Sequence, residues 1–187
     1  MSGHGHIDPS NKKIALLIAI LALILAFSET LAKGSQTNAL SYNIEASNLW
    51  SFFQAKTIRM TMVRTSMESA EMELKQTKSQ AAKEILGEQI ESWKKSAARY
   101  DSEPETQEGR KELMARAKNA EKKRDLSMAA YHHYELASAA LQIAIVLASA
   151  KIITGVAAMA WISGGLGVVG LAFCLIGYFA PLAIHLF

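Results

Sequence analysis

The sequence feature that most constrains the fold is a seven-residue repeat of mostly apolar side chains between Tyr42 and Leu74. One core position of the repeat holds Ala46, Phe53, Met60, Met67 and Leu74, and the alternate position holds Tyr42, Leu49, Lys56, Val63 and Ala70. This spacing is typical of an amphipathic helix that packs against another helix. Lys56 is the one charged residue in the repeat, and Trp50 lies beside the repeat position Leu49. The repeat therefore predicts a helical body with coiled-coil-like packing.

Apolar stretches flank this body, and each is long enough to cross a hydrocarbon core of ~30 Å as a helix. The predicted fold class is all-α: an integral membrane protein with three transmembrane helices and an extramembrane helical body between the first and the second. The predicted segments are a polar tail over residues 1–13, transmembrane helices over residues 14–33, 139–161 and 164–187, and the body over residues 34–138.

The first apolar stretch allows a second interpretation, because a basic start and the small residue Ala32 also suit a signal peptide. Its length favours a transmembrane helix. Lys12 and Lys13 before it favour a cytoplasmic N-terminus, with Lys33 opposing. We therefore expect a multi-pass protein of the inner membrane, with the lipid bilayer as a partner and the helical body in the periplasm.

Length constrains how the body folds. As one straight helix, residues 34–100 would extend ~100 Å, whereas residues 110–138 return only ~45 Å at ~1.5 Å per residue. Both ends must meet the same membrane face, so we expect the outgoing helix to fold back within residues 75–83; a tilted or kinked arm is the alternative. Pro104 and Gly109 predict a further turn over residues 101–109. Residues 162–165, with two glycines, are expected to join the second and third transmembrane helices.

Charge and motifs narrow the class of function. All but three of the Lys and Arg residues lie between Lys33 and Arg124, interspersed with acidic residues, which argues against a nucleic-acid partner. The single cysteine, Cys174, excludes an intrachain disulfide. The sequence contains no phosphate-binding glycine loop, no metalloprotease motif and no nucleophile elbow. We expect no catalytic activity, no cofactor and no metal site, and we interpret Tyr131–Tyr134, with its two histidines, as an interfacial aromatic belt.

Two charged residues, Glu29 and Lys151, lie within the apolar stretches. Charge in lipid is costly and is usually paired, so one hypothesis is an intramembrane ion pair, within a chain or between neighbours. The alternative places Glu29 in the headgroup region. Small residues, Gly167 and Gly170 among them, predict close helix packing, either within the hairpin of the last two transmembrane helices or between protomers.

The run from Ile44 to Arg59, with Ala46-Ser47-x-x-Trp50 followed by Gln54-Ala55-Lys56, resembles the signature of an uncharacterised bacterial membrane protein family, domain of unknown function 4337. Members share the layout of one early span, a charged helical middle and two closing spans. The resemblance implies this architecture and no particular activity. It also implies that Trp50, Gln54 and Lys56 belong to a shared feature.

We interpret the chain as a homo-oligomeric structural or scaffold protein that self-assembles through the 42–74 helix and the small-residue transmembrane helices. The residues expected to pack are Tyr42, Ala46, Leu49, Trp50, Phe53, Lys56, Met60, Val63, Met67, Gly167 and Gly170. Two alternatives remain. One is a pore or transporter subunit with Glu29, Lys151 and Gln142 along the path. The other is an accessory subunit of a larger complex with other membrane proteins.

Overall fold

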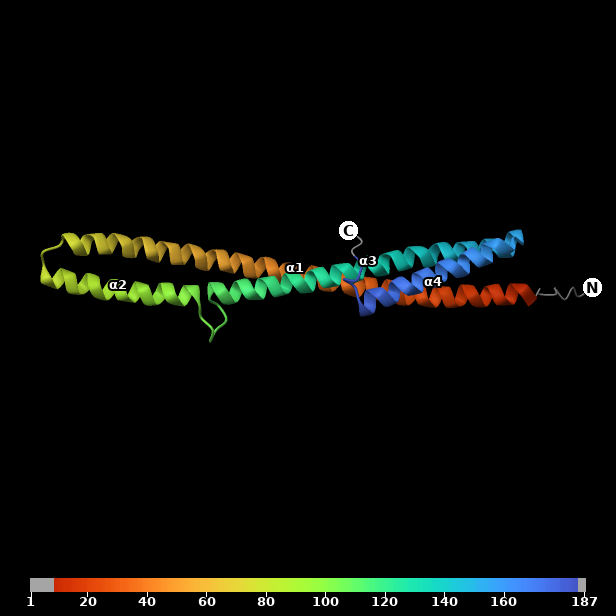
Figure 1. The fold of residues 1–187 in the computed structure, drawn as a ribbon, viewed down its shortest axis with the longest axis horizontal. Coiled ribbons are helices and arrows are strands. Elements are labelled where there is room, and N and C mark those ends of the chain that lie inside the picture. Colours follow the sequence, from red (N-terminus) through yellow and green to blue (C-terminus); the bar gives the residue numbers. More distant parts are fainter. Residues whose placement is uncertain (1–8, 185–187) are drawn as a thin grey trace, which may run out of the picture. The chain divides into compact units, whose positions relative to one another are not determined.

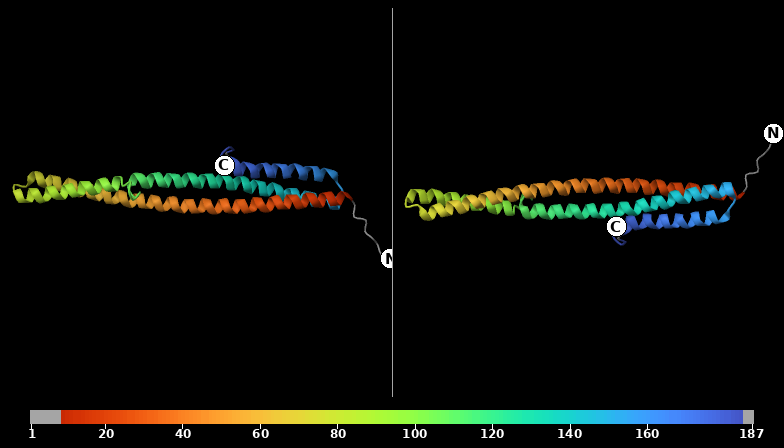
Figure 2. Two further views of the ribbon diagram at one scale, coloured as in Figure 1. Left: turned by 90° about the horizontal axis from the view of Figure 1, so that it is seen from below. Right: turned by 90° about the horizontal axis from the view of Figure 1, so that it is seen from above.

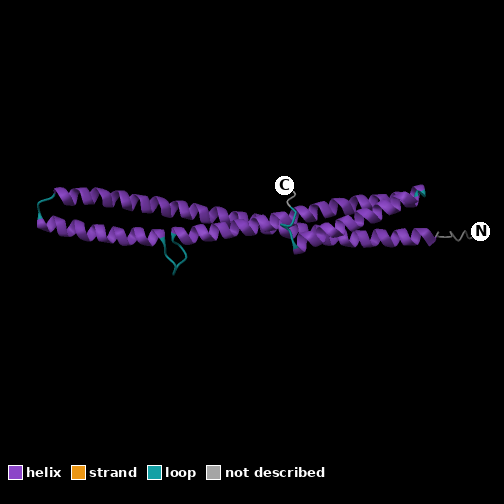
Figure 3. Cartoon of the chain, viewed as in Figure 1, coloured by secondary structure: helices purple, strands orange, loops and turns teal. Residues whose placement is uncertain are grey.

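A computed structural model describes residues 9–184, and over this range the chain forms four α-helices and no strand (Figures 1 and 3). The helices are α1 (Pro9–Gln76), α2 (Gln80–Asp101), α3 (Arg110–Thr154) and α4 (Ala157–Phe179). The all-helical prediction is confirmed. Of the predicted N-terminal tail, residues 1–8 lie outside the described range, and α1 has begun by Pro9. The helices form two compact units: unit 1 comprises Met1–Leu40 and Arg124–Phe187, and unit 2 comprises Ser41–Lys123.

Unit 2 consists of α1 from Ser41, all of α2, and α3 up to Lys123. The chain reverses between α1 and α2, and Ser79 caps α2 by accepting a hydrogen bond from the Ala82 amide at 3.4 Å. This reversal confirms the fold-back predicted for residues 75–83 and is visible where α1 ends in Figure 1. Within unit 2, α1 is as long in residues as α2 and the start of α3 combined. The chain therefore goes out along α1 and returns along α2 and then α3.

The loop between α2 and α3, residues 102–109, confirms the second predicted turn. Pro104 cannot continue a helix, because it lacks the amide donor. Gln107 adopts the left-handed conformation with φ of 58°. Gly109 is buried against the loop itself, and a Cβ there would collide with the Glu112 carboxylate and the Glu103 amide. The close approach of the loop to α3 therefore requires glycine at position 109.

The apolar repeat of α1 forms the core of unit 2. Ala46 and Leu49 are buried in one cluster with α3 residues Leu113, Ala117 and Ala120, and Trp50 and Phe53 pack against this cluster. Every position of the repeat from Tyr42 to Leu74 is buried or half-buried, which confirms its packing role. Other helices of the same chain cover this face, and self-assembly through it stays a prediction.

Unit 1 is built from α1 up to Leu40, α3 from Arg124, and α4. Leu21, Leu141 and Ala144 form its buried apolar cluster. Among the residues described, α1, α3 and α4 are long and apolar enough to cross a membrane. Figure 2 shows α3 and α4 side by side in both views.

The connection between α3 and α4 corrects the sequence-based prediction. It lies at Gly155 and Val156, and residues 162–165 are inside α4. Gly155 has a φ of +74°, a conformation that glycine adopts without strain and that ends α3. Gly164 and Gly165 make no tight turn, and a Cβ at either would meet nothing within 4 Å. A cluster of glycines in an apolar helix was mistaken for a helix breaker.

The other glycines of α4 allow close packing within the chain. A Cβ at Gly167 would lie 2.6 Å from Leu21 Cδ2 of α1, and one at Gly170 would lie 2.7 Å from Leu141 Cγ of α3. Both glycines are buried. The predicted small-residue packing is therefore found within one chain, against α1 as well as α3.

Replacing Gly170 by alanine should weaken unit 1, because the new methyl group would overlap Leu141 and approach the Ala137 carbonyl oxygen to 3.1 Å. Overpacking of this kind costs about 1–3 kcal/mol. Gly164→Ala is the matched control, since its methyl group would meet open space. Thermal unfolding in detergent, followed by circular dichroism, should give a lower midpoint for Gly170→Ala than for Gly164→Ala. Equal midpoints would contradict the packing.

Candidate functional site: the Lys56 cluster of unit 2

Lys56 is the charged residue in the apolar repeat of α1, and it is only 7% exposed. Its ammonium nitrogen Nζ lies 3.8 Å from Glu103 Oε2 and 3.9 Å from Glu108 Oε2, both in the loop between α2 and α3. Glu103 is itself largely buried, whereas Glu108 is half exposed. A buried charge needs such partners, because its removal from water is costly.

Two aromatic rings complete the surroundings of Lys56. Its Nζ lies 5.4 Å from the centroid of Phe52, one turn earlier on α1, and 5.6 Å from that of Tyr100 on α2. Aromatic faces attract a cation at these distances. Phe52 is 38% exposed, so it shields the ammonium from the solvent side. Lys56 thus contacts α1, α2 and the loop from one position.

Arg110, the first residue of α3, makes a second link to α1. Its Nε donates a hydrogen bond to Thr57 Oγ1 at 2.9 Å, and its guanidinium lies 5.1 Å from the centroid of Phe53. The same guanidinium is paired with Asp101, the last residue of α2, at 3.4 Å. Arg110 therefore joins the ends of α2 and α3 to the outgoing helix.

Two carboxylates at the ends of α2 and α3, Asp101 and Glu112, have lowered pKa values. The hydrogen bond from Lys111 Nζ at 2.7 Å is the main cause that lowers the pKa of Asp101. The pKa of Glu112 is lowered because it accepts hydrogen bonds from Ser102 Oγ at 2.6 Å and from the Glu103 amide at 3.1 Å. The loop is thereby fixed on the side facing α3 as well as on the side facing α1.

The remaining predicted packing residues also find partners in unit 2. Trp50 Nε1 donates a hydrogen bond to Glu121 Oε1 on α3 at 2.9 Å. Lys123 Nζ lies 5.5 Å from the ring centroid of Tyr42. Met60 is buried, and Val63 and Met67 are half-buried. These contacts extend the α1–α3 pairing on either side of Lys56.

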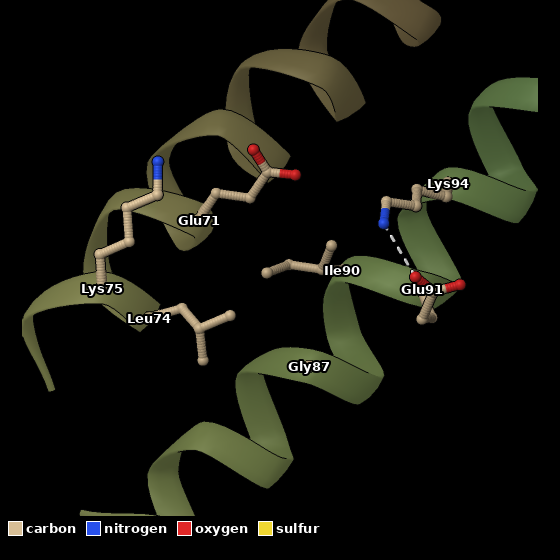
Figure 4. Close-up of a pocket in the computed structure, with 7 residues that line it drawn as sticks. All are labelled: Glu71, Leu74, Lys75, Gly87, Ile90, Glu91 and Lys94. Carbon is tan, nitrogen blue, oxygen red and sulfur yellow. Dashed lines mark hydrogen bonds and ion pairs between the residues drawn. The ribbon is translucent and has the colours of Figure 1, made fainter. Parts of the chain in front are cut away.

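Nearer the turn of unit 2, an open groove of about 480 Å³ lies between α1 and α2. Leu74 and Ile90 point toward one another across it, with charged side chains around them (Figure 4). The groove is lined by Glu71, Leu74, Lys75, Gly87, Ile90, Glu91 and Lys94. Lys94 donates to Glu91 at 2.9 Å, and the lining residues include no Ser, Cys or His.

In unit 1, buried polar contacts join α1 to α3 and also α4 to α3, where Ser163 Oγ donates to the Ala144 carbonyl oxygen at 2.7 Å. Ser28 Oγ, fully buried, donates to the Tyr134 carbonyl oxygen at 2.9 Å and accepts from Ser138 Oγ at 3.0 Å. Next to it, Glu29 Oε1 accepts a hydrogen bond from Gln142 Nε2 at 3.2 Å. Sequence reasoning missed the two serines; small polar residues inside apolar helices are the signal that could have found them.

The structure gives Glu29 a different partner from the one predicted. Lys151 follows Gln142 by about two and a half turns of α3, or about 13 Å along the helix. It lies one turn from the end of α3 at Thr154, because the connection to α4 comes earlier than expected. Glu29 and Lys151 are thus at different levels of unit 1. An ion pair between copies of the chain stays a prediction.

The predicted aromatic belt at Tyr131–Tyr134 is only partly at the surface. Tyr131 and His132 are half-buried, whereas His133 and Tyr134 are buried. His133 Nε2 lies 3.1 Å from the Pro181 carbonyl oxygen, and its ring stacks on Phe173 with centroids 6.1 Å apart. His133 therefore packs inside unit 1 as a contact between α3 and the end of α4. Within residues 9–184, no group of three or more His, Cys, Asp or Glu could hold a metal ion.

These features define a class: an all-helical protein with three helices apolar enough for a membrane and a helical unit closed by buried ion pairs. The chain belongs to the family described as Domain of unknown function (DUF4337), which matches residues 10–180. The resemblance seen in the Ala46–Lys56 run is confirmed. No curated protein and no solved structure matches the chain.

Replacing Lys56 by methionine should destabilise unit 2, because Glu103 would lose its buried cation and keep the exposed Arg99, at 2.8 Å, as its ionic partner. Since Glu103 stays partly satisfied, we expect a loss of about 1 kcal/mol, the lower end of the cost of an unsatisfied buried polar group. Lys118→Met, at an exposed position of α3, is the matched control. Adding Glu103→Gln to Lys56→Met should restore part of the loss.

Urea unfolding followed by circular dichroism would measure both effects. Equal stability of Lys56→Met and Lys118→Met would show that the Lys56 cluster does not hold the helices together.

Proposed function

We propose that this protein is an integral protein of the inner membrane with a structural role: a non-catalytic scaffold anchored by three transmembrane helices. The observation that carries the proposal is the number of large apolar side chains exposed on unit 1. Large apolar residues are exposed, such as Leu23, Phe27 and Val146, while Ser28, Ser138 and Ser163 are buried. Such a surface is unfavourable in water and suits lipid, where small polar residues join helices from within.

Aromatic residues at the two ends of α4 support a transmembrane placement. Trp161 is 83% exposed near the start of the helix, and Tyr178 is 66% exposed near its end. About 26 Å of helix separates them at 1.5 Å per residue. This distance is close to the ~30 Å of a hydrocarbon core, and exposed aromatic rings are enriched at its two interfaces.

The ends of the helices support a cytoplasmic N-terminus. Lys12 and Lys13 lie near the start of α1, and Lys151 lies near the end of α3. With three transmembrane helices, both of these ends are on the same side of the membrane. Lys and Arg residues favour the cytoplasmic side, and Lys33 at the other end of the first apolar stretch opposes this orientation. On the balance of these charges we place unit 2 in the periplasm.

A structural role is supported by what the polar residues of unit 2 do. The side chains of Lys56, Arg110 and Glu112 are engaged with neighbouring helices and the loop, which is an arrangement that fixes helices in register. The lining of the groove near the turn includes no Ser, Cys or His. Helices joined to one another in this way suit a spacer or scaffold. We also expect several copies of the chain to assemble.

A second candidate, a pore or transporter subunit, is favoured by the Glu29–Gln142 pair. Both residues are exposed, and so are their apolar neighbours Phe27 and Ile143. A carboxylate facing lipid is costly, so it usually faces an aqueous path or another protein. Copies that assemble with this pair inward would cover it and could line a path.

Native mass spectrometry in lipid nanodiscs tests the proposal. We expect the protein to remain in the membrane after alkaline carbonate extraction and to show a discrete multiple of 20.4 kDa. A single-chain mass would contradict self-assembly, and release by carbonate would contradict membrane integration. Ion flux in liposomes that disappears in Glu29→Gln would favour the pore over the scaffold.

A further inference from the structure

The loop between α2 and α3, residues 102–109, is held largely by carboxylates, and we name it the strap. On the side facing α1, Glu103 and Glu108 of the strap both pair with Lys56, at 3.8 Å and 3.9 Å. On the side facing α3, Glu112 accepts a hydrogen bond from the Glu103 amide at 3.1 Å. The attachment of the strap to its neighbours therefore depends on groups that acid protonates.

The buried charge of Lys56 makes the contact with α1 sensitive to acid. Among residues 9–184, the carboxylates paired with Lys56 are those of Glu103 and Glu108. The rings of Phe52 and Tyr100 also lie near its Nζ, but they carry no net charge. Once both carboxylates are protonated, Lys56 is a buried cation without a counter-charge, which is strongly destabilising. This cost is removed when the ammonium group reaches water.

The other charged groups around the strap act in the same direction. The cations that face the strap or its two ends are Lys56 and Arg64 of α1, Arg99 of α2, and Arg110, Lys111 and Arg116 of α3. The acidic groups are Asp101, Glu103, Glu105, Glu108 and Glu112, with the Tyr100 phenol beside them. Acid removes the negative charges and leaves the positive ones, which repel one another.

One contact on the side facing α3 does not depend on a carboxylate. Arg116 Nη1 donates a hydrogen bond to the Gln107 carbonyl oxygen at 3.2 Å. Neither group changes its charge in mild acid. The strap should therefore keep a contact with α3 when it loses its ion pairs with α1.

The pKa values of two carboxylates at the ends of the strap give the sign of the pH dependence. The pKa of Asp101 is lowered mainly by the hydrogen bond from Lys111, and that of Glu112 mainly by the hydrogen bond from Ser102. A carboxylate with a lowered pKa contributes stability above its ordinary pKa, here 3.8 for Asp101 and 4.5 for Glu112. This stability is lost as the pH falls through the lowered value. Acid therefore weakens the ends of the strap and never strengthens them.

The apolar cluster of unit 2 limits how far acid can open the structure. Ala46 and Leu49 of α1 pack there against α3 residues such as Leu113, and none of these side chains titrates. Acid therefore acts on the strap without acting directly on the pairing of α1 with α3. Such an opening is local and leaves the rest of the unit folded.

We propose that the strap separates from α1 in acid, when Glu103 and Glu108 are protonated and Lys56 moves into water, while α1 and α3 stay packed. The inference goes beyond the scaffold role and does not depend on it, because all the groups involved lie in unit 2. A strap of this kind makes the shape of unit 2 respond to the acidity of its surroundings.

Distances between spin labels, measured by pulsed electron paramagnetic resonance, test the separation. In a Cys174→Ser background, Arg59→Cys places a label at an exposed position of α1, and Thr106→Cys places one at an exposed position of the strap. Between pH about 7 and pH about 3, on either side of the ordinary carboxyl pKa, this distance should lengthen and its distribution should broaden. The matched control is Ser47→Cys with Lys118→Cys, at exposed positions of α1 and α3 next to the apolar cluster, and its distance should not change.

Variants of the strap identify the groups responsible. Glu103→Gln combined with Glu108→Gln mimics protonation of both carboxylates, so it should give the longer distance already at pH about 7. Lys56→Met removes the buried cation and should abolish most of the lengthening in acid. Glu105→Gln changes an exposed carboxylate of the strap and should behave like the unmodified chain.

Three results would overturn the proposal. The first is an unchanged distance between positions 59 and 106 in acid. The second is an equal lengthening in Lys56→Met and in the unmodified chain. The third is a change in both label pairs together with a loss of helix content by circular dichroism, because acid would then unfold unit 2 as a whole. Each of these results would leave the proposed scaffold role standing.

Discussion

Unit 2 depends on covering the apolar repeat of α1. A helix that carries Leu49, Phe53 and Met60 along one face is unfavourable in water unless another helix lies against that face. The chain supplies this cover itself, by reversing after Gln76 and returning through α2 and α3. Because the return uses two helices, a loop lies opposite the middle of α1. Lys56 occurs at that level and binds the loop carboxylates that an apolar residue could not.

The two units differ in what lies between their helices. In unit 2 an apolar cluster is accompanied by charged residues that join the helices near the loop. In unit 1 buried serines and glycines lie beside a small apolar cluster, while many large apolar residues are exposed. This arrangement supports the proposed placement of unit 1 in lipid, where hydrophobic burial no longer drives helix association and close approach does. It links the sequence to the proposed membrane anchor.

Several elements were predictable because their cause is local or follows from length. The 3.5-residue period identified the packing face of α1. The unequal lengths of the arms predicted a reversal within residues 75–83, and the structure has it between Gln76 and Gln80. The connection between α3 and α4 was predicted at the wrong place. Gly155, which has a positive φ, ends α3, whereas Gly164 and Gly165 lie inside α4 and do not end it. The partners of Lys56 and the Ser28–Ser138 contact were not predictable, since they join residues far apart in the sequence. Their identity depends on the register of the arms.

The central claim is that the repeat of α1 is covered within a single chain. In a Cys174→Ser background, Ala46→Cys combined with Ala120→Cys places one thiol on α1 and one on α3 in the same buried cluster. A short thiol-specific crosslinker should join the two thiols, and the product should keep the mass of one chain, 20.4 kDa. Either single cysteine should give no crosslinked dimer. Crosslinking only between chains would contradict the account, because it would show that the repeat packs at an interface between chains.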